Sequence, residues 1–281
     1  MAALSQEALQ RLCDCFANAA RKFGLTISIK KTETLYQPGK GNAHAPQPIL
    51  IDGQQLNDVP SFKYLGGIAS NTASMDLEID ARVAGATSAF GRLTKRLWTN
   101  KGVRLDTKVS VYKAAVLTSL LYGCETWTLN QKQILRLEKF NQSCLRRIAR
   151  IRWFHKLTNY EVLDRCKIPS IQSMVDKAKL RWTGHVIRME DDRIPKMMLY
   201  GRLGTGSSSR GNHNTYLNSV KATLRACEIN STHLEEQACD RNNWRATLNA
   251  GIAVAETART RNLIDKRLRR KARTDLALLS T

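Results

Sequence analysis

The run Ser61–Ile68 limits the fold more than any other stretch, because it is the last place where apolar and polar side chains alternate clearly. Its sequence, Ser-Phe-Lys-Tyr-Leu-Gly-Gly-Ile, predicts a strand that ends tightly at a glycine pair. We expect Phe62, Tyr64 and Ile68 to face one side, and we expect the glycines to allow another segment to approach closely. Strands are therefore predicted only in the first quarter of the chain.

The residues before this run predict one helix and further strands. Ser5 is a typical helix N-cap, apolar residues follow at helical spacing, and Gly24 is a typical helix end. The alternation over residues 25–29 predicts a strand, which the polar residues 30–34 continue, and residues 49–56, with Asp-Gly at their centre, predict a hairpin. We expect one small antiparallel sheet beside one helix.

The rest of the chain predicts helices. Apolar residues three and four apart predict long helices over 75–98, over 105–121 and from about Asn130. Thr158 with Glu161 forms a capping box that starts a shorter helix, and Ser170 starts another. Two modest helices and a long one from about Asn243 follow. The predicted fold class is α+β, mostly α.

Composition and pattern together predict a division into four parts. A small sheet region over 1–70 precedes a helical region over 71–200, a Gly- and Ser-rich linker over 201–212 and a basic helical extension over 213–281.

The net charge points to a polyanionic partner. The chain has 45 Lys and Arg against 24 Asp and Glu, a formal charge of +21. Nucleic acid is the first partner to consider and an anionic membrane surface the second. No apolar run is long enough to span a bilayer, and the N-terminus does not resemble a secretion signal. We expect an intracellular, nuclear protein that binds RNA and DNA and no membrane.

The basic residues are most concentrated over 131–197, which hold sixteen Lys or Arg and seven Asp or Glu. The candidate phosphate contacts are Arg146, Arg147, Arg150, Arg152, Lys179 and Arg181, with Arg269 and Arg270 in the run 266–273. Aromatic residues are interleaved with them, namely Trp153, Phe154, Tyr160 and Trp182. Each ring taken singly is expected in the core, because aromatic residues stabilise a fold mainly by burial.

No arrangement of residues predicts catalysis or a metal. The seven cysteines are odd in number and scattered, so we expect reduced thiols, and their spacings do not match a zinc site. Glu190, Asp191 and Asp192 could hold a divalent ion as in a nuclease, but adjacent acids at a helix end are usually solvated. His185 is expected to be a packing residue rather than a base.

Four runs, in this order, resemble the C-terminal half of the reverse transcriptase of LINE-type, non-LTR retrotransposons. They are Gly24–Glu33 (Gly-Leu-Thr-Ile-Ser-Ile-Lys-Lys-Thr-Glu), Phe62–Gly67, Leu120–Trp127 and Arg181–Met189. The resemblance covers about residues 10 to 250. It implies that the first run ends the palm, that the second is the primer-grip hairpin, and that the basic helices form a thumb and its extension. It also implies that Lys31, Tyr64, Gly66 and Gly67 lie near the primer end or incoming nucleotide.

The chain departs from that family in its catalytic residues. Polymerisation needs paired aspartates that hold two metal ions, one of them in a Tyr/Phe-Ala-Asp-Asp turn, and that turn is absent from this sequence. We therefore expect a fragment without catalytic residues that binds template and primer, needs no cofactor, and depends on separate palm and fingers and their Mg²⁺ for polymerisation. The alternatives are a basic helical RNA- or DNA-binding protein used by the host, and a nuclease using the acids at 190–192.

Overall fold

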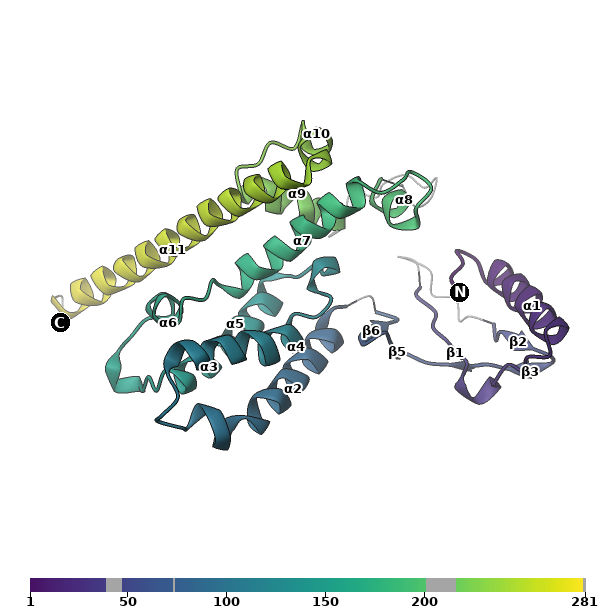
Figure 1. Cartoon of the computed structure of the whole chain (residues 1–281), viewed down its shortest axis with the longest axis horizontal. Helices are drawn as coiled ribbons and strands as arrows, with labels where there is room; N and C mark the ends of the chain where they lie inside the picture. Colours follow the sequence, from purple (N-terminus) through teal and green to yellow (C-terminus); the bar gives the residue numbers. More distant parts are fainter. Residues whose placement is uncertain (39–46, 73, 201–215, 280–281) are drawn as a thin grey trace. The chain divides into compact units, whose positions relative to one another are not determined.

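The computed structural model describes residues 1–38, 47–72, 74–200 and 216–279 (Figure 1). By its internal contacts the chain divides into two compact units, Met1–Asp80 and Ala81–Thr281, and each unit is described by itself below. The predicted linker 201–212 lies outside the described residues. The other predicted boundaries, and the identities given to those parts, stay predictions.

The first unit begins with the predicted helix, α1 (Gln6–Lys22). The Ser5 hydroxyl accepts a hydrogen bond from the backbone N–H of Ala8 at 3.2 Å, so the predicted cap is confirmed. Gly24 follows the helix with a φ of +68°, which glycine adopts without a steric penalty. The buried face of α1 packs on a small core made of Cys13, Ala17, Ile49, Ile51 and Leu56.

The predicted hairpin is confirmed as β2 (Leu50–Ile51) paired antiparallel with β3 (Gln54–Gln55). Asp52 and Gly53 both have positive φ, as a type I′ turn requires. The Gln10 side chain of α1 accepts from the Leu50 N–H at 2.9 Å and donates to its carbonyl at 2.7 Å. A helix side chain thus satisfies backbone groups that an edge strand would otherwise expose.

The predicted strand is wrong over 25–29, and only the end of its predicted continuation, Glu33–Thr34, forms a strand. Instead, the Leu25 N–H donates to the Ala20 carbonyl, and a 3₁₀ turn forms at Ile29–Lys31. Ile27 and Ile29 still pack on the core, in agreement with the alternation that predicted the strand. The expected single antiparallel sheet is also wrong, because the strands among the described residues form three separate pairs. One of these, β1 (Glu33–Thr34) with β4 (Asn57–Asp58), is parallel.

The opening motif of the sequence forms β5 (Ser61–Tyr64) and β6 (Gly67–Ser70), joined by a two-residue turn. Leu65 and Gly66 have φ of 48° and 87°, so the predicted tight exit is confirmed. The expected position of Ile68 is wrong. Ile68 pairs with Lys63, and residues directly opposite in an antiparallel ladder share a face. Phe62 and Tyr64 therefore face the other side, with ring centroids 6.5 Å apart.

The regular elements of the second unit are all helical among its described residues, and with the small strands of the first unit this confirms a mostly α, α+β fold. Helix α2 (Asp76–Arg92) crosses the boundary between the units and runs into a π-helical turn, η2 (Thr94–Trp98). The predicted helix over 105–121 forms as α3 (Leu105–Val111), a π-helical segment η3 (Tyr112–Leu117) and α4 (Thr118–Leu120). A short 3₁₀ turn, η4 (Cys124–Thr126), follows.

Capping residues start the next helices where the sequence predicts them. Asn130 caps α5 (Gln131–Ile148), the Thr158 and Glu161 box caps α6 (Asn159–Arg165), and Ser170 caps α7 (Ile171–Ile187). A 3₁₀ turn, η5 (Trp153–His155), lies between α5 and α6.

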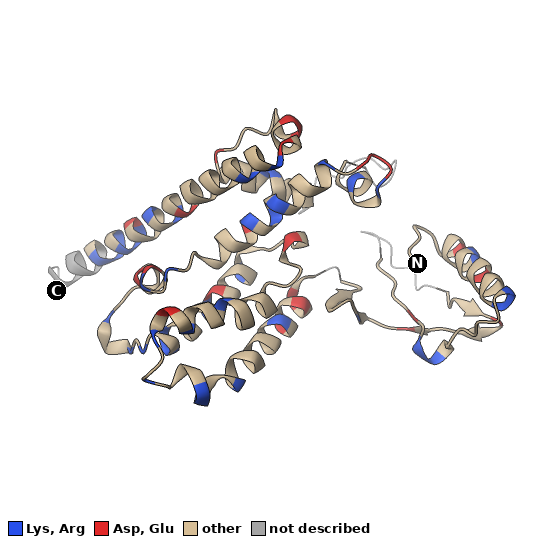
Figure 2. Cartoon of the chain, in the orientation of Figure 1, with Lys and Arg blue, Asp and Glu red and all other residues tan. Residues whose placement is uncertain are grey.

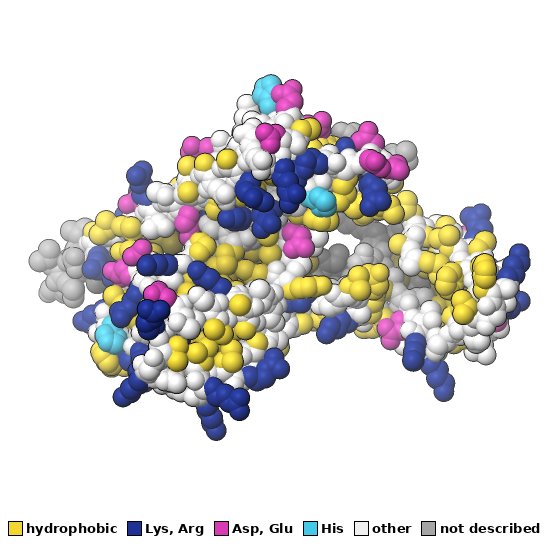
Figure 3. Space-filling view, in the orientation of Figure 1, with side chains coloured by type: hydrophobic (Ala, Val, Ile, Leu, Met, Phe, Trp, Pro, Cys, Tyr) yellow, Lys and Arg dark blue, Asp and Glu magenta, His cyan; other side chains and the backbone are white. Residues whose placement is uncertain are grey.

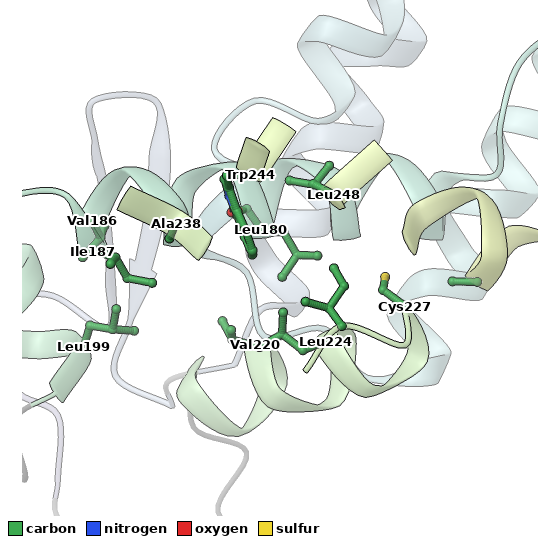
Figure 4. Close-up of a cluster of buried hydrophobic side chains, with 12 residues drawn as sticks. Leu180, Val186, Ile187, Leu199, Val220, Leu224, Cys227, Ala238, Trp244 and Leu248 are labelled. Carbon is green, nitrogen blue, oxygen red and sulfur yellow. The ribbon is translucent and has the colours of Figure 1, made fainter. Parts of the chain in front are cut away.

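The C-terminal helices pack around α7. They are α8 (Ile194–Tyr200), which was not predicted, and the predicted α9 (Tyr216–Ala226), α10 (Leu234–Cys239) and α11 (Arg241–Leu279). Their apolar faces form one buried cluster with α7, in which Leu180, Leu224, Trp244 and Leu248 are almost completely enclosed (Figure 4). All seven cysteines are free. Within the described ranges, the chain has no helix that is both long and apolar enough to cross a membrane.

Candidate nucleic-acid interface

A groove of about 700 Å³ runs between α7 and the start of α11. Its lining comes mainly from one face of each helix, with Glu125 of η4 added at its edge. The residues are Glu125, Lys177, Ala178, Arg181, Trp182, His185, Arg188, Arg241, Trp244, Arg245, Leu248 and Asn249. Figure 3 shows Lys and Arg side chains gathered here with a histidine beside them.

The groove is strongly cationic. Five of its side chains are Lys or Arg and one is acidic. Arg188 also donates to the Ala238 carbonyl at 2.5 Å, so part of its role is to hold α10 on α7. Lys177, Arg181, Arg241 and Arg245 are exposed, and none of them has a hydrogen-bond or ion-pair partner among the described residues. Four cations facing solvent in one groove are suited to binding phosphates.

The position of two of these arginines is unfavourable for the helix that carries them. Arg241 and Arg245 lie in the first two turns of α11, where the helix dipole favours anions and disfavours cations. Asp240 offsets this only locally, by accepting hydrogen bonds from the N–H groups of Asn242 and Asn243. The arginines and the helix terminus therefore add to the same positive potential at the groove.

A glycine brings the two helices close enough to form the groove. Gly184 of α7 lies against the indole of Trp244, and a Cβ at that position would overlap the ring. Trp244 in turn donates from Nε1 to the Leu180 carbonyl at 3.1 Å (Figure 4). The motif Arg-Trp-Thr-Gly-His thus serves two purposes, since Arg181 and His185 line the groove while Gly184 sets the helix spacing.

Two carboxylates hold the N-terminus of α7. Glu138 of α5 accepts from the Ile171 N–H at 2.6 Å. Glu256 of α11 accepts from the Ser170 N–H at 2.9 Å and from the Ser170 hydroxyl at 2.6 Å. The first N–H groups of a helix have no partner within it, and acids placed there also complement its dipole. Helices α5, α7 and α11 are therefore fixed to one another.

A buried ion pair continues this contact. Arg259 of α11 donates to Asp176 of α7 at 3.1 Å, and the Asp176 side chain is only 4% exposed. Arg259 also reaches Glu256 at 3.4 Å and the Ser173 hydroxyl at 2.5 Å. Because breaking a buried pair leaves a charge without compensation, this network fixes α11 on α7.

Lys179, a predicted phosphate contact, is buried, in contrast to its neighbour Arg181. Its ammonium group donates to the Ser219 hydroxyl at 2.6 Å, and burial lowers the pKa of this lysine. In a helix, residues two apart face different directions. Arg181 therefore faces the groove while Lys179 ties α9 to α7.

The arginines around the end of α5 are mostly engaged within the chain. Arg146 donates to the Leu157 carbonyl at 2.9 Å, and Arg150 donates to the Thr99 carbonyl at 2.7 Å. Arg147 lies over the Phe90 ring, with its guanidinium carbon 5.2 Å from the centroid. These contacts give three predicted nucleic-acid residues a structural role. The side chain of Arg152 is exposed.

The other predicted contacts are exposed, except for Gly66 and Gly67, which are partly buried. Arg269 and Arg270 belong to the basic second half of α11, where Lys and Arg recur along the helix (Figure 2). In the first unit, Lys31 is exposed and lies in the 3₁₀ turn Ile29–Lys31, and Tyr64 is 66% exposed. Gly66 and Gly67 lie at the turn between β5 and β6. These four residues come from two segments of the first unit, the turn Ile29–Lys31 and the hairpin of β5 and β6.

Sequence reasoning missed most of the groove, which includes only Arg181 of the predicted set. A signal for it was present. Lys177, Arg181, His185 and Arg188 follow at helical spacing, and Arg241 and Arg245 are four apart. The apolar residues between them predict the helices, but the spacing of the cations alone does not show that α7 and α11 bring the two sets together.

The structure gives no support to a nuclease site at 190–192. Asp191 pairs with Lys196 at 2.8 Å, and the three acids are exposed. Across the described ranges, His, Cys, Asp and Glu side chains do not gather in threes as metal ligands. Among the residues that the structure describes, the acids at 190–192 thus have no further His, Cys, Asp or Glu beside them to complete a set of metal ligands.

Comparison with known proteins relates the chain to mobile elements. It is 30% identical over 188 residues to a putative uncharacterized transposon-derived protein of Caenorhabditis elegans, which covers 62% of this chain and 63% of that protein. It is 24% identical over 167 residues to the RNA-directed DNA polymerase from mobile element jockey of Drosophila funebris, which covers 59% of this chain and 18% of the polymerase. The chain thus spans less than two thirds of either relative. Searches found no matching family model and no matching solved structure.

Proposed function

We propose that this chain is the thumb and C-terminal part of a reverse transcriptase from a non-LTR mobile element, and that it binds template and primer through the groove between α7 and α11. The observation that carries the proposal is the group of four exposed cations in that groove, Lys177, Arg181, Arg241 and Arg245. The similarity to a jockey RNA-directed DNA polymerase supports the same assignment. The assignment also agrees with the order of the four sequence runs, the last of which begins in α7.

The proposed activity is binding without polymerisation. No Tyr/Phe-Ala-Asp-Asp sequence occurs in these 281 residues, and no metal-ligand cluster forms among the described ones. The groove offers guanidinium and ammonium groups, which bind phosphate oxygens whatever the base sequence. The proposed partners are RNA and DNA, with the palm and fingers supplied by another part of the enzyme.

The test is the affinity of the chain for an RNA–DNA hybrid, measured by fluorescence anisotropy at several salt concentrations. We expect log K to fall linearly with log salt concentration. Replacing Arg181 and Arg245 by Gln should weaken binding about tenfold or more and reduce the salt slope by roughly two, since each lost phosphate contact reduces it by roughly one.

The matched control is the double variant Lys95→Gln, Arg96→Gln. It removes the same charge from exposed positions of η2 that do not line the groove. Its affinity should stay close to that of the wild type. Equal losses in the two double variants would show that net charge, and not the groove, drives binding, and absence of binding at low salt would overturn the proposal.

A further inference from the structure

The turn between α5 and α6 exposes two large aromatic side chains, against the expectation that each would be buried. Trp153 is 87% exposed and Phe154 is 58% exposed. Exposing rings of this size to water is unfavourable, since each would stabilise the fold by burial. Isolated apolar side chains on a surface are common, but two adjacent rings in a fixed turn need a further explanation.

The turn that carries these rings is held at both ends. Ile151 anchors it in the core with 7% of its surface exposed. Before the rings, Arg150 adopts a φ of 56° and donates to the Thr99 carbonyl. After them, Arg146 donates to the Leu157 carbonyl. The exposure of the rings is therefore a consequence of a fixed backbone.

The rings also contact one another. Trp153 and Phe154 have centroids 6.0 Å apart at 80°, and Phe154 and His155 have centroids 4.5 Å apart at 42°. His155 is fixed in turn, because its Nδ1 accepts a hydrogen bond from the Arg152 N–H at 2.8 Å. Three consecutive rings form an ordered exposed group with little conformational freedom left to lose on binding.

The charges beside the three rings indicate what kind of partner would cover them. Arg152 and Lys156 flank the rings and are exposed, and the sequence has no Asp or Glu between Glu138 and Glu161. Cations beside exposed rings match a ligand that has both phosphates and flat apolar faces. Unpaired nucleotides have both, whereas a base-paired duplex keeps its base faces stacked inside the helix.

We propose that residues 152–156 form a stacking platform for the unpaired bases of a single nucleic-acid strand, with Trp153 and Phe154 against the bases and Arg152 and Lys156 near the phosphates. The proposal rests on nucleic acid being the partner of this chain. It gives the chain a second binding site besides the groove, and it assigns single-stranded nucleic acid to that second site.

The test compares two oligonucleotides of equal length and charge, one of thymidines and one with abasic sites throughout. Stacking of one base contributes about 1–3 kcal/mol, so Trp153→Ala should weaken binding of the thymidine strand by about five- to 150-fold. Binding of the abasic strand should be unchanged, because its phosphates remain. Trp153 is exposed, so the variant should keep the circular dichroism spectrum of the wild type.

Two further variants separate stacking from apolar contact. Trp153→Phe keeps a ring and should retain most of the affinity for the thymidine strand, whereas Trp153→Leu keeps an apolar side chain and should lose it. Equal affinities of the wild type, Trp153→Ala and Trp153→Leu for the thymidine strand would overturn the stacking proposal. If vesicles of phosphatidylserine and phosphatidylcholine then bound the wild type and Trp153→Leu but not Trp153→Ala, the rings would be a lipid contact instead.

The test of the groove and the test of the stacking platform can succeed or fail separately. Loss of hybrid binding in Arg181→Gln, Arg245→Gln with no effect of Trp153→Ala on the thymidine strand would leave the proposed function standing and remove the platform. No binding of either nucleic acid by the wild type would remove both.

Discussion

The Trp244 indole lies directly over the α-carbon of Gly184, so α7 and α11 meet at a position where no side chain fits between them. Replacing Gly184 by Ala should push the helices apart and lower the free energy of unfolding by about 1–3 kcal/mol, the usual cost of overpacking. Urea unfolding followed by tryptophan fluorescence measures this change in the second unit, which contains all five tryptophans. The hybrid affinity should fall as well, because the same contact sets the width of the groove.

Gly91 is the matched control for this substitution. It also lies in a helix, α2, but a Cβ added there would meet open space. Gly91→Ala should therefore stabilise the protein by about 0.5–1 kcal/mol, the usual gain from alanine in a helix. A destabilisation of the same size at both glycines would contradict the role given to Gly184.

The ion pair between Arg259 and the buried Asp176 is expected to be the contact of α11 whose loss lowers stability most. Arg259→Leu would leave Asp176 buried without its ion-pair partner, and loss of one partner of such a pair costs about 3–5 kcal/mol. Arg261→Leu changes an exposed arginine two residues further along the same helix and should cost less than about 0.5 kcal/mol. Similar losses in both variants, measured by urea unfolding, would contradict the structural role of the pair.

The Glu256 carboxylate should make the second unit sensitive to acid. Burial raises the pKa of Glu256, but hydrogen bonds from Ser170 and Ser173 and the charge of Arg259 outweigh this and hold it below its usual value of 4.5. A lowered pKa in the folded state means that the carboxylate stabilises the fold above about pH 4.5 and that this contribution is lost as the pH falls through the folded pKa. Unfolding free energies measured from pH 7 to pH 3 should therefore decrease less in Glu256→Gln than in the wild type.

The pKa of Glu138 is shifted in the opposite direction from that of Glu256, so the two residues can be compared. Burial raises the pKa of Glu138 although the N–H groups of Ile171 and Gln172 donate to it. A raised folded pKa favours the folded state at low pH and disfavours it as the pH rises above the unfolded pKa. Glu138→Gln should thus lose stability more steeply with acid than the wild type. Parallel pH profiles for the two variants would contradict this assignment.

Leu65 is expected to be replaceable with a gain in stability. It has a φ of 48° in the turn between β5 and β6, and its side chain is 77% exposed. Asparagine tolerates this conformation better than leucine, so Leu65→Asn should stabilise the hairpin by about 1 kcal/mol. Slower hydrogen exchange over residues 61–70, measured by mass spectrometry, would report the gain. Unchanged or faster exchange would show that Leu65 makes a contact worth more than the backbone strain.

Local signals in the sequence predicted most of the helices and one of the turns correctly. Ser5, Asn130, Thr158 and Ser170 each begin a helix as capping residues, and Asp52-Gly53 forms the hairpin turn. These features depend on neighbouring residues, so a single sequence contains them. The strand over 25–29 failed because a strand also needs a partner, and pairing between distant segments is not encoded in the local pattern.

The candidate site was harder to predict for the same reason. Lys179 and Arg181 are equally basic in the sequence, yet the packing of α9 buries the first and leaves the second in the groove. Arg146 and Arg150 bind carbonyls that lie 11 and 51 residues away. Trp153 is exposed because distant contacts fix its turn. The nucleic-acid partner that the charge indicates stays a prediction, whereas which basic side chains are exposed depends on tertiary contacts.

The two carboxylates that hold the N-terminus of α7 bear on the distance between a ligand at the aromatic turn and a ligand in the groove. Glu138 lies on α5, whose end leads into the aromatic turn, and Glu256 lies on α11, whose start forms one wall of the groove. The turn and the groove are thus carried by helices that are joined to α7 through these two carboxylates. A strand long enough to occupy both would be shielded from nucleases over a constant number of nucleotides, whatever its sequence.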